Sequence, residues 1–579
     1  MIFATLALIS SASLLLANPI SPRDAAIRDS PCGSYAPCEV TCPAGLQVRQ
    51  TTRTGPINPQ ESAYIAAKAA ASKSMWSTYL ANANITDFNI TSFIPTGSPV
   101  PGVTLPNVAM AVSGGGFRAM LTGGGVLSGF DNRNSSAVAA GTGGILQLAN
   151  YAAGLSGGAW CIGSWALADF PTFTDMLSVW DLAENALLPK KDDPNLYLDA
   201  ATSLLAKAAA GFPVASVDPY GRLISYHLFD DLDNPTGPGS TTLFSSIQNV
   251  TQFANSAAPF PIIYSTGREL FQANITIANP NYEYTPYAFG LNSPAVGSVD
   301  IPIQYLGSSF ISGHPTTNAC VQGYENAGSS WLMGTSGNSI TNPGLLLELS
   351  ANLTTAEQAI LEGVFSLIPD SLVDTGIVAN PFHGINSSRY VSSGDDTLYL
   401  IDGGASYPLT NLPLWPLIQP ARKVDVIFAI DDSNDTPDLY PNGAALYAEY
   451  QKVSQPGWGA ENYPFPRIPT PQQFVASGRN KRISFLGSAC QNSSTTAATP
   501  LVVYIPKHDV VYAVNDTAST AQFSAAQQQG YYANGFAIAT AAGNGACLAC
   551  AMVDAQLARN GVARSAQCQV CFADYCYNA

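Results

Sequence analysis

NVAMAVSGGGFRAM occupies residues 107–120 and carries three successive structural signals. Residues 107–112 form a short apolar run, which predicts a buried strand. The glycines at 114–116 predict a tight loop, and residues 117–120 can open a helix. A strand, a glycine loop and a helix in this order are typical of an α/β fold.

The three glycines Gly114, Gly115 and Gly116 offer consecutive backbone N–H groups that no side chain covers. Such donors suit an oxyanion or a phosphate, and a flexible turn is the alternative interpretation. Arg118 follows, and its fixed fork of donors can pair with a phospholipid phosphate or stabilise developing charge. An ordinary salt bridge is the alternative for Arg118.

A second strand-like segment ends in a nucleophile motif. The apolar run 144–153 is followed by GLSGG at 154–158, and residues 159–167 can form a helix. The pattern G-x-S-x-G places a serine, here Ser156, on a sharp turn, with the N–H of Gly157 beside the developing oxyanion. In a chain with 49 glycines, a chance glycine-serine loop is the competing explanation.

A third segment supplies a base. Residues 397–401 resemble a strand and lead into Asp402 and two glycines. A poorly solvated Asp402 can take the serine proton directly, whereas a hairpin turn is the alternative reading of Asp-Gly. The chain contains only four histidines, which are His227, His314, His383 and His508.

Together, SGGGFRAM, GLSGGAW and the DGG that precedes Asn411-Leu-Pro-Leu414 resemble the fungal lysophospholipase/phospholipase B family. That family shares its catalytic motifs with the cytosolic phospholipases A. The resemblance also includes residues 218–222 (DPYGR) and 282–287 (YEYTPY), and with the cysteine-rich ends it spans nearly the whole chain.

The resemblance implies a patatin-like α/β core like that of cytosolic phospholipase A, with three α/β/α layers and disulfide-rich termini. It implies that Ser156 attacks an acyl ester, that Asp402 is the base and that water hydrolyses the acyl-enzyme. We expect no metal, no cofactor and no calcium requirement, because no docking domain fits ahead of residue 107. The implied oxyanion and substrate-binding residues are Gly114, Gly115, Gly116, Arg118 and Gly157.

Composition indicates a globular protein with material for a large core. Hydrophobic residues make up 46% and charged residues 11% of the 579 positions. A formal charge of −16 argues against nucleic acid and against electrostatic docking on anionic membranes. We expect an N-terminal segment at 18–106, with a helix at 63–80 and a connection at 86–106, before a catalytic domain at 107–579. Residues 32–579 are expected to form one folded unit.

The first residues predict export. Residues 1–17 form an uncharged apolar run that ends in small residues, as a signal peptide does, and no later run is long enough to span a membrane. We therefore expect a secreted protein without a lipid anchor, acting on phospholipid and lysophospholipid micelles or membranes and carrying N-glycans. The Asn-x-Ser/Thr sequons are Asn84, Asn89, Asn134, Asn249, Asn274, Asn352, Asn386, Asn434, Asn492 and Asn515.

The 11 cysteines cluster at both ends of the chain. Cys547, Cys550, Cys568 and Cys571 have the spacing of a four-thiolate zinc site. An oxidising exterior favours disulfides instead, which would tie the ends to the body. The odd count leaves one thiol over, and Cys161, in an apolar stretch, is the candidate.

Two other functions remain open at this point. One is a conventional α/β-hydrolase esterase or lipase with a Ser156–Asp402–His508 triad, which follows the chain order serine, acid, histidine. The other is a secreted glycoprotein without catalysis, in which the glycine loops serve packing.

Overall fold

A computed structural model of the chain describes residues 30–577, apart from 95–104, 187–188, 190–193, 216, 230–237, 271, 328–354, 356–358, 360–374, 387–389, 406–409, 456–457, 459–464 and 491–498. The expected signal peptide and the sequons Asn352 and Asn492 lie outside the described residues.

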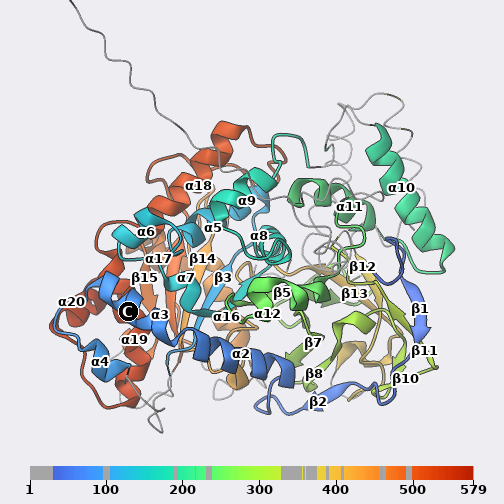
Figure 1. Ribbon diagram of the computed structural model, residues 1–579, viewed down its shortest axis with the longest axis horizontal. Coiled ribbons are helices and arrows are strands. Elements are labelled where there is room, and N and C mark those ends of the chain that lie inside the picture. Colours follow the sequence, from blue (N-terminus) through green and yellow to red (C-terminus); the bar gives the residue numbers. More distant parts are fainter. Residues whose placement is uncertain are drawn as a thin grey trace, which may run out of the picture.

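Within the described residues, one mixed sheet of twelve strands organises the molecule (Figure 1). Its path runs β15-β16-β14-β3-β4-β5-β6-β7-β8-β2, and β13 joins β5 to β12. The strands from β16 to β5 along this path are parallel, and the remaining pairs are antiparallel. The bounds of the sheet strands are β2 (Arg49–Thr51), β3 (Val108–Val112), β4 (Ala149–Gly154), β5 (Phe260–Arg268), β6 (Asn281–Tyr284), β7 (Ala288–Ser293), β8 (Gly297–Pro302), β12 (Gly376–Ala379), β13 (Thr397–Asp402), β14 (Val426–Asp431), β15 (Ser484–Leu486) and β16 (Leu501–Pro506).

The described helices and the short strands outside the sheet complete the fold. β1 (Cys38–Thr41) pairs with β11 (Ala319–Gln322), and β9 (Phe310–Ile311) with β10 (His314–Pro315). The helices are α2 (Pro59–Ala71), α3 (Lys73–Ala83), α4 (Ile90–Phe93), α5 (Gly116–Ser128), α6 (Ser135–Ala139), α7 (Ile145–Leu148), α8 (Gly157–Leu167), α9 (Phe173–Val179), α10 (Pro194–Ala209), α11 (Val217–Leu228), α12 (Thr251–Ala254), α16 (Ala444–Val453), α17 (Pro471–Ala476), α18 (Ala525–Ala539), α19 (Asn544–Arg559) and α20 (Ala566–Tyr575).

Helices cover both faces of the sheet. A Cβ added at Gly123 of α5 would lie 2.7 Å from Val112 Cγ1, so Val112 faces α5. Tyr151 donates to Glu61 Oε1 of α2 at 3.1 Å and therefore faces α2. Ala109 pairs with Tyr151 and lies three residues from Val112, which places Val112 and Tyr151 on opposite faces. The predicted α/β class and its layered core are confirmed.

The strand–loop–helix prediction for residues 107–120 is confirmed by β3 and α5, and the helix predicted after Ser156 is α8. Two local predictions differ in their bounds. The strand expected before Ser156 is β4, but the first part of the run 144–153 forms α7, because periodicity cannot separate a short buried helix from a strand. The helix expected over 63–80 is two helices, α2 and α3, which Ser72 separates.

Among the described residues, three disulfides lie within the chain ends and two tie an end to the body of the chain, as predicted. The four residues with zinc-like spacing form the disulfides Cys547–Cys571 and Cys550–Cys568, so their thiolates are not available to a metal. Cys161 is the free cysteine among the described residues, and it is buried, as predicted. The other pairs are Cys32–Cys38, Cys42–Cys320 and Cys490–Cys576.

In the described part of the chain, no single helix is long and apolar enough to cross a membrane. The bent pair α18 and α19 meets the criteria of length and composition when taken together.

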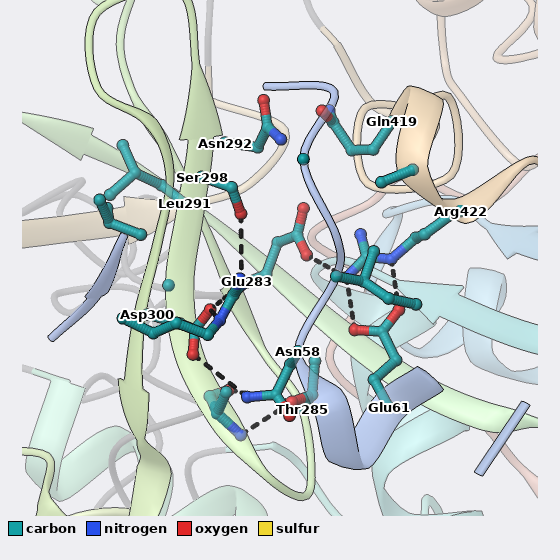
Figure 2. A pocket seen from close by; sticks show the side chains of 17 residues that line it. Asn58, Glu61, Glu283, Thr285, Leu291, Asn292, Ser298, Asp300, Gln419 and Arg422 are labelled. Atoms are coloured by element: carbon teal, nitrogen blue, oxygen red, sulfur yellow. Dashed lines mark hydrogen bonds and ion pairs between the residues drawn. The ribbon is translucent and has the colours of Figure 1, made fainter. Parts of the chain in front are cut away.

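A buried ion-pair network fastens α2 to the sheet. Arg422 lies between two carboxylates, with Nε 2.7 Å from Glu61 Oε1 and Nη2 2.7 Å from Glu283 Oε2 (Figure 2). These groups line a cavity rich in polar side chains, to which Arg49 and Asp300 contribute a further ion pair. Burial raises the pKa of Glu283, and Arg422 opposes that rise.

Arg422→Met is expected to destabilise the fold by about 3–5 kcal/mol, because it leaves two buried carboxylates without their cation. Urea unfolding measures the loss. Arg482→Met is the matched control, since its partner Asp574 is 59% exposed and the pair should contribute less than about 1 kcal/mol. Equal losses for the two variants would contradict the role assigned to Arg422.

Candidate active site

The sheet brings the three sequence motifs to one edge. β3 leads into the glycine loop and β4 into Ser156, and parallel neighbours end at the same edge. β4 stops where Gly154 pairs with Ile263 of β5. β13 approaches from the other direction along β5, antiparallel to it, and ends where Asp402 pairs with Ser265. Because β6 occupies the other side of β5, β4 and β13 meet end to end along β5.

Ser156 has a backbone conformation that side chains rarely adopt. Its φ is 50° and its ψ is −128°, which is a strained strand-to-helix turn. The turn requires glycines on either side. A Cβ at Gly154 would lie 2.4 Å from the Gly158 carbonyl oxygen, and one at Gly158 would lie 2.1 Å from that of Val112. The sharp turn therefore depends on the small residues of the motif.

The glycine loop packs directly on this turn. A Cβ at Gly157 would lie 2.1 Å from the carbonyl oxygen of Gly116, and one at Gly114 would lie 2.9 Å from Ser156 Cβ. Gly116 and Gly157 are the first residues of α5 and α8, so their N–H groups have no acceptor within the helix. Two helix N-termini thus lie beside the Ser156 hydroxyl, where they can stabilise an oxyanion.

Asp402 lies near the serine. Burial raises the pKa of Asp402 to about 6, and two neighbours partly oppose this rise. The first is the Gly404 N–H, which donates to Oδ1 at 2.8 Å, and the second is the side chain of Ser156. A desolvated carboxylate next to a serine hydroxyl can act as a general base.

Arg118 lies behind the glycine loop. Its side chain is 1% exposed, and Nη1 is 2.8 Å from Asp432 Oδ1. It also donates to Asn434 Oδ1. Gly115 lies against it, since a Cβ there would be 2.8 Å from Arg118 Nη2. Arg118 therefore forms the salt bridge that was its alternative interpretation. Its guanidinium also packs against the glycine loop at Gly115.

Lys507 extends this charged cluster. Its Nζ lies 3.2 Å from Asp432 Oδ1 and 3.2 Å from Asn434 Oδ1. Burial lowers the pKa of Lys507 to about 8, and the charge of Asp432 opposes this effect. Lys507 follows β16 and Asp432 follows β14, so the parallel strands deliver both groups to the edge that carries Ser156.

Sequence reasoning did not single out several supporting residues. Asn411 fixes Gly114 from both sides, because Gly114 N–H donates to its carbonyl oxygen at 3.1 Å and Asn411 Nδ2 donates to the Gly114 carbonyl at 3.1 Å. Asn411 also donates to Ser433 Oγ at 2.9 Å. Burial, and then the charge of Asp402, raise the pKa of Tyr220. Asn411 and Tyr220 lie in stretches that carry the family resemblance, and that resemblance was the sequence signal that could have identified them.

His508 has other neighbours. Its Nδ1 lies 2.9 Å from the Pro506 carbonyl oxygen, and Asp509 and Lys481 act on its charge. Among the contacts of the described residues, none joins His508 to Ser156 or Asp402. In the described part of the chain, Gly404 and Ser156 are the groups that lower the pKa of Asp402, and no histidine is among its causes.

No group of three or more His, Cys, Asp or Glu side chains within the described part of the chain could hold a metal ion. The polar cavity of Figure 2 lies between α2, the strands β6 to β8 and the loop at 419–422, so it is separate from Ser156.

Known proteins resemble this chain over most of its length. Residues 108–579 match the family model described as the lysophospholipase catalytic domain. A lysophospholipase of Penicillium chrysogenum is 32% identical over 96% of this chain and 91% of its own length. A lysophospholipase of Arthroderma benhamiae is 34% identical over 99% and 91%, and lysophospholipase 3 of Candida albicans is 34% identical over 94% and 74%.

The fold resembles a solved structure of human GIVD cytosolic phospholipase A2. The two align with a TM-score of 0.64 at 14% identity, over 90% of this chain and 72% of that one. At this level of identity the likeness concerns the fold, and it agrees with the predicted catalytic core.

Proposed function

Because the chain belongs to the fungal lysophospholipase family, we propose that it hydrolyses the fatty-acyl esters of lysophospholipids, and of diacyl phospholipids, through a Ser156–Asp402 dyad. Membership makes the chain a carboxylic ester hydrolase that acts on phospholipid esters. One observation supports the dyad above all: Ser156, on a strained turn, lies close enough to the buried Asp402 carboxylate to lower its pKa.

In the first half of the reaction, Ser156 Oγ attacks the ester carbonyl carbon while Asp402 takes its proton. Negative charge moves to the carbonyl oxygen, and the backbone N–H groups of Gly115, Gly116 and Gly157 stabilise it. The bond to the alcohol oxygen then breaks, and Asp402 returns the proton to that oxygen. The products of this half are an acyl-serine and a free glycerophospho-alcohol.

In the second half, water replaces the alcohol. Asp402 takes a proton from water, and the water oxygen attacks the carbonyl carbon of the acyl-serine. The same N–H groups stabilise the second oxyanion. The ester bond to Ser156 breaks and Asp402 protonates Oγ, which restores the dyad and releases a fatty acid. Arg118, held by Asp432, keeps the glycine loop in place and contributes positive charge toward the substrate phosphate.

The buried base predicts a pH profile. Only the ionised carboxylate of Asp402 can accept the serine proton, and its pKa is raised to about 6. The activity kcat/KM should therefore fall about tenfold per pH unit below this value and level off above it. Initial rates between pH 4 and pH 8 on a zwitterionic lysophospholipid measure it. A rate that stays constant down to pH 4 would mean that Asp402 titrates as an ordinary carboxylate.

The substrate class is tested by product analysis. Purified protein is incubated with lysophosphatidylcholine, and fatty acid and glycerophosphocholine are expected in equal amounts, with and without a calcium chelator. Phosphatidylcholine then distinguishes the removal of one acyl chain from the removal of both. Release of choline or phosphocholine would contradict acyl-ester hydrolysis, and loss of activity with the chelator would contradict metal-free chemistry.

We also infer that the protein is secreted and N-glycosylated. The disulfides at both chain ends suit an oxidising compartment, and the apolar residues 1–17 suit a cleaved leader. Mass spectrometry of secreted protein before and after glycan removal tests this inference. The described sequon residues that are exposed, and hence expected to carry glycans, are Asn84, Asn89, Asn249, Asn274, Asn386 and Asn515.

A further inference from the structure

The outer face of α10 exposes an apolar stripe. Leu198 is 59% exposed and Leu205 is 54% exposed, although leucines are usually buried. Residues seven apart lie on the same face of a helix, so the two side chains point the same way. Between them Thr202 is exposed, and Ala208 continues the stripe.

This face carries no exposed charge. The charged residues of α10 are Asp199, which is half-buried, and Lys207, which is buried. An uncharged apolar stripe matches a surface without net charge, such as one of zwitterionic phospholipids. A protein with a formal charge of −16 would be repelled from an anionic surface. Electrostatic repulsion therefore also favours zwitterionic over anionic phospholipids.

The opposite face of α10 is fastened to the active-site side of the molecule. Lys207 Nζ lies 2.5 Å from Asp218 Oδ1 of α11, and both side chains are buried. Tyr35 also donates to Asp218 Oδ1 at 2.6 Å. This ion pair fixes which side of α10 faces outward, and Figure 1 shows α10 at the periphery beside α11.

α11 in turn packs on the first turns of the two catalytic helices. Its Tyr220 ring lies 6.4 Å from that of Trp160 in α8, and its His227 ring lies 5.6 Å from Phe117 in α5. These are the helix ends that carry the N–H groups of Gly116 and Gly157. α10 is therefore separated by α11 alone from the helix ends beside Ser156, which an aggregated lipid substrate must approach.

From these observations we propose that the outer face of α10, defined by Leu198 and Leu205, docks on the surface of aggregated zwitterionic phospholipid. The helix lies in the plane of the interface, and its two leucines enter the acyl boundary. The choice of a lipid as the occupant rests on the proposed function, whereas the exposure and the tethering of the face do not.

The test is the double variant Leu198→Glu/Leu205→Glu, because glutamate keeps the helix propensity of leucine. Co-flotation with phosphatidylcholine vesicles and hydrolysis of micellar lysophosphatidylcholine are compared with hydrolysis of a water-soluble short-chain ester. Vesicle binding should fall, and KM for micelles should rise, by about tenfold or more. Hydrolysis of the soluble ester should stay at the wild-type rate.

Val562→Glu/Val570→Glu is the matched control, since these valines are 52% and 68% exposed on another part of the surface. The control should bind vesicles as the wild type does. An equal loss in the control, unchanged binding by the leucine variant, or loss of soluble-ester hydrolysis would each overturn the proposal. A wild-type dimer that the leucine variant dissociates would assign the face to a second copy. Wild type that binds vesicles but hydrolyses no ester would refute the proposed function and leave the docking face standing.

Discussion

Ser156→Ala is expected to lower kcat on lysophosphatidylcholine by about 10⁴-fold or more, because no other hydroxyl can form the acyl-enzyme at this turn. Asp402→Asn should cause a loss of similar size, since an amide cannot accept the serine proton. The two losses should not add, because serine and base act as one unit. The double variant Ser156→Ala/Asp402→Asn should therefore be no slower than Ser156→Ala.

His508→Ala separates the dyad from a triad. Its Nδ1 lies against the Pro506 carbonyl, so its removal should change kcat by less than about threefold. Circular dichroism and thermal unfolding establish that each variant folds. A folded His508→Ala protein as inactive as Ser156→Ala would replace the dyad by a Ser156–Asp402–His508 triad, and a fully active Ser156→Ala protein would remove the nucleophile assignment.

Gly157→Ala is expected to have the second-largest effect. The added Cβ would lie 2.1 Å from the Gly116 carbonyl oxygen, and backbone cannot move aside as a flexible side chain can. Relieving the contact separates the turn from the glycine loop, which moves an oxyanion donor. We expect kcat to fall by about 10²–10³-fold and stability by about 1–3 kcal/mol.

Gly394→Ala is the control for this substitution. A Cβ at Gly394 would have nothing within 4 Å, so the variant should match the wild type in rate and in urea midpoint. Comparing the loss in kcat with the loss in the free energy of unfolding separates a role in oxyanion stabilisation from a role in packing. A Gly157→Ala protein that is destabilised but keeps its kcat would show that the loop serves packing and not oxyanion stabilisation.

The catalytic motifs were predictable because each is local. The strand, the glycine loop and the helix around Gly114–Gly116, and the turn at Ser156, follow from consecutive residues whose spacing reflects backbone requirements. Glycines that cannot accept a Cβ leave a clear signal in the sequence. The disulfide preference at the chain ends followed from composition and compartment in the same way.

The supporting contacts were not predictable because they depend on strand order. Lys507 and Asp432 meet because β16 and β14 are parallel neighbours, and no single segment of sequence records that pairing. The same holds for Asn411 on Gly114. Asp402 illustrates both cases: its position after a strand was visible, whereas its approach to Ser156 follows from the shared partner β5.

The end-to-end meeting of β4 and β13 on β5 has an evolutionary consequence. β5 positions both Ser156, the proposed nucleophile, and Asp402, the proposed base. The distance between them therefore does not depend on the long stretch of chain that joins them. Insertions and deletions between Ser156 and Asp402 can therefore accumulate without changing how the two residues are placed. Substrate selectivity can thus diversify within such a lineage while the chemistry remains constant.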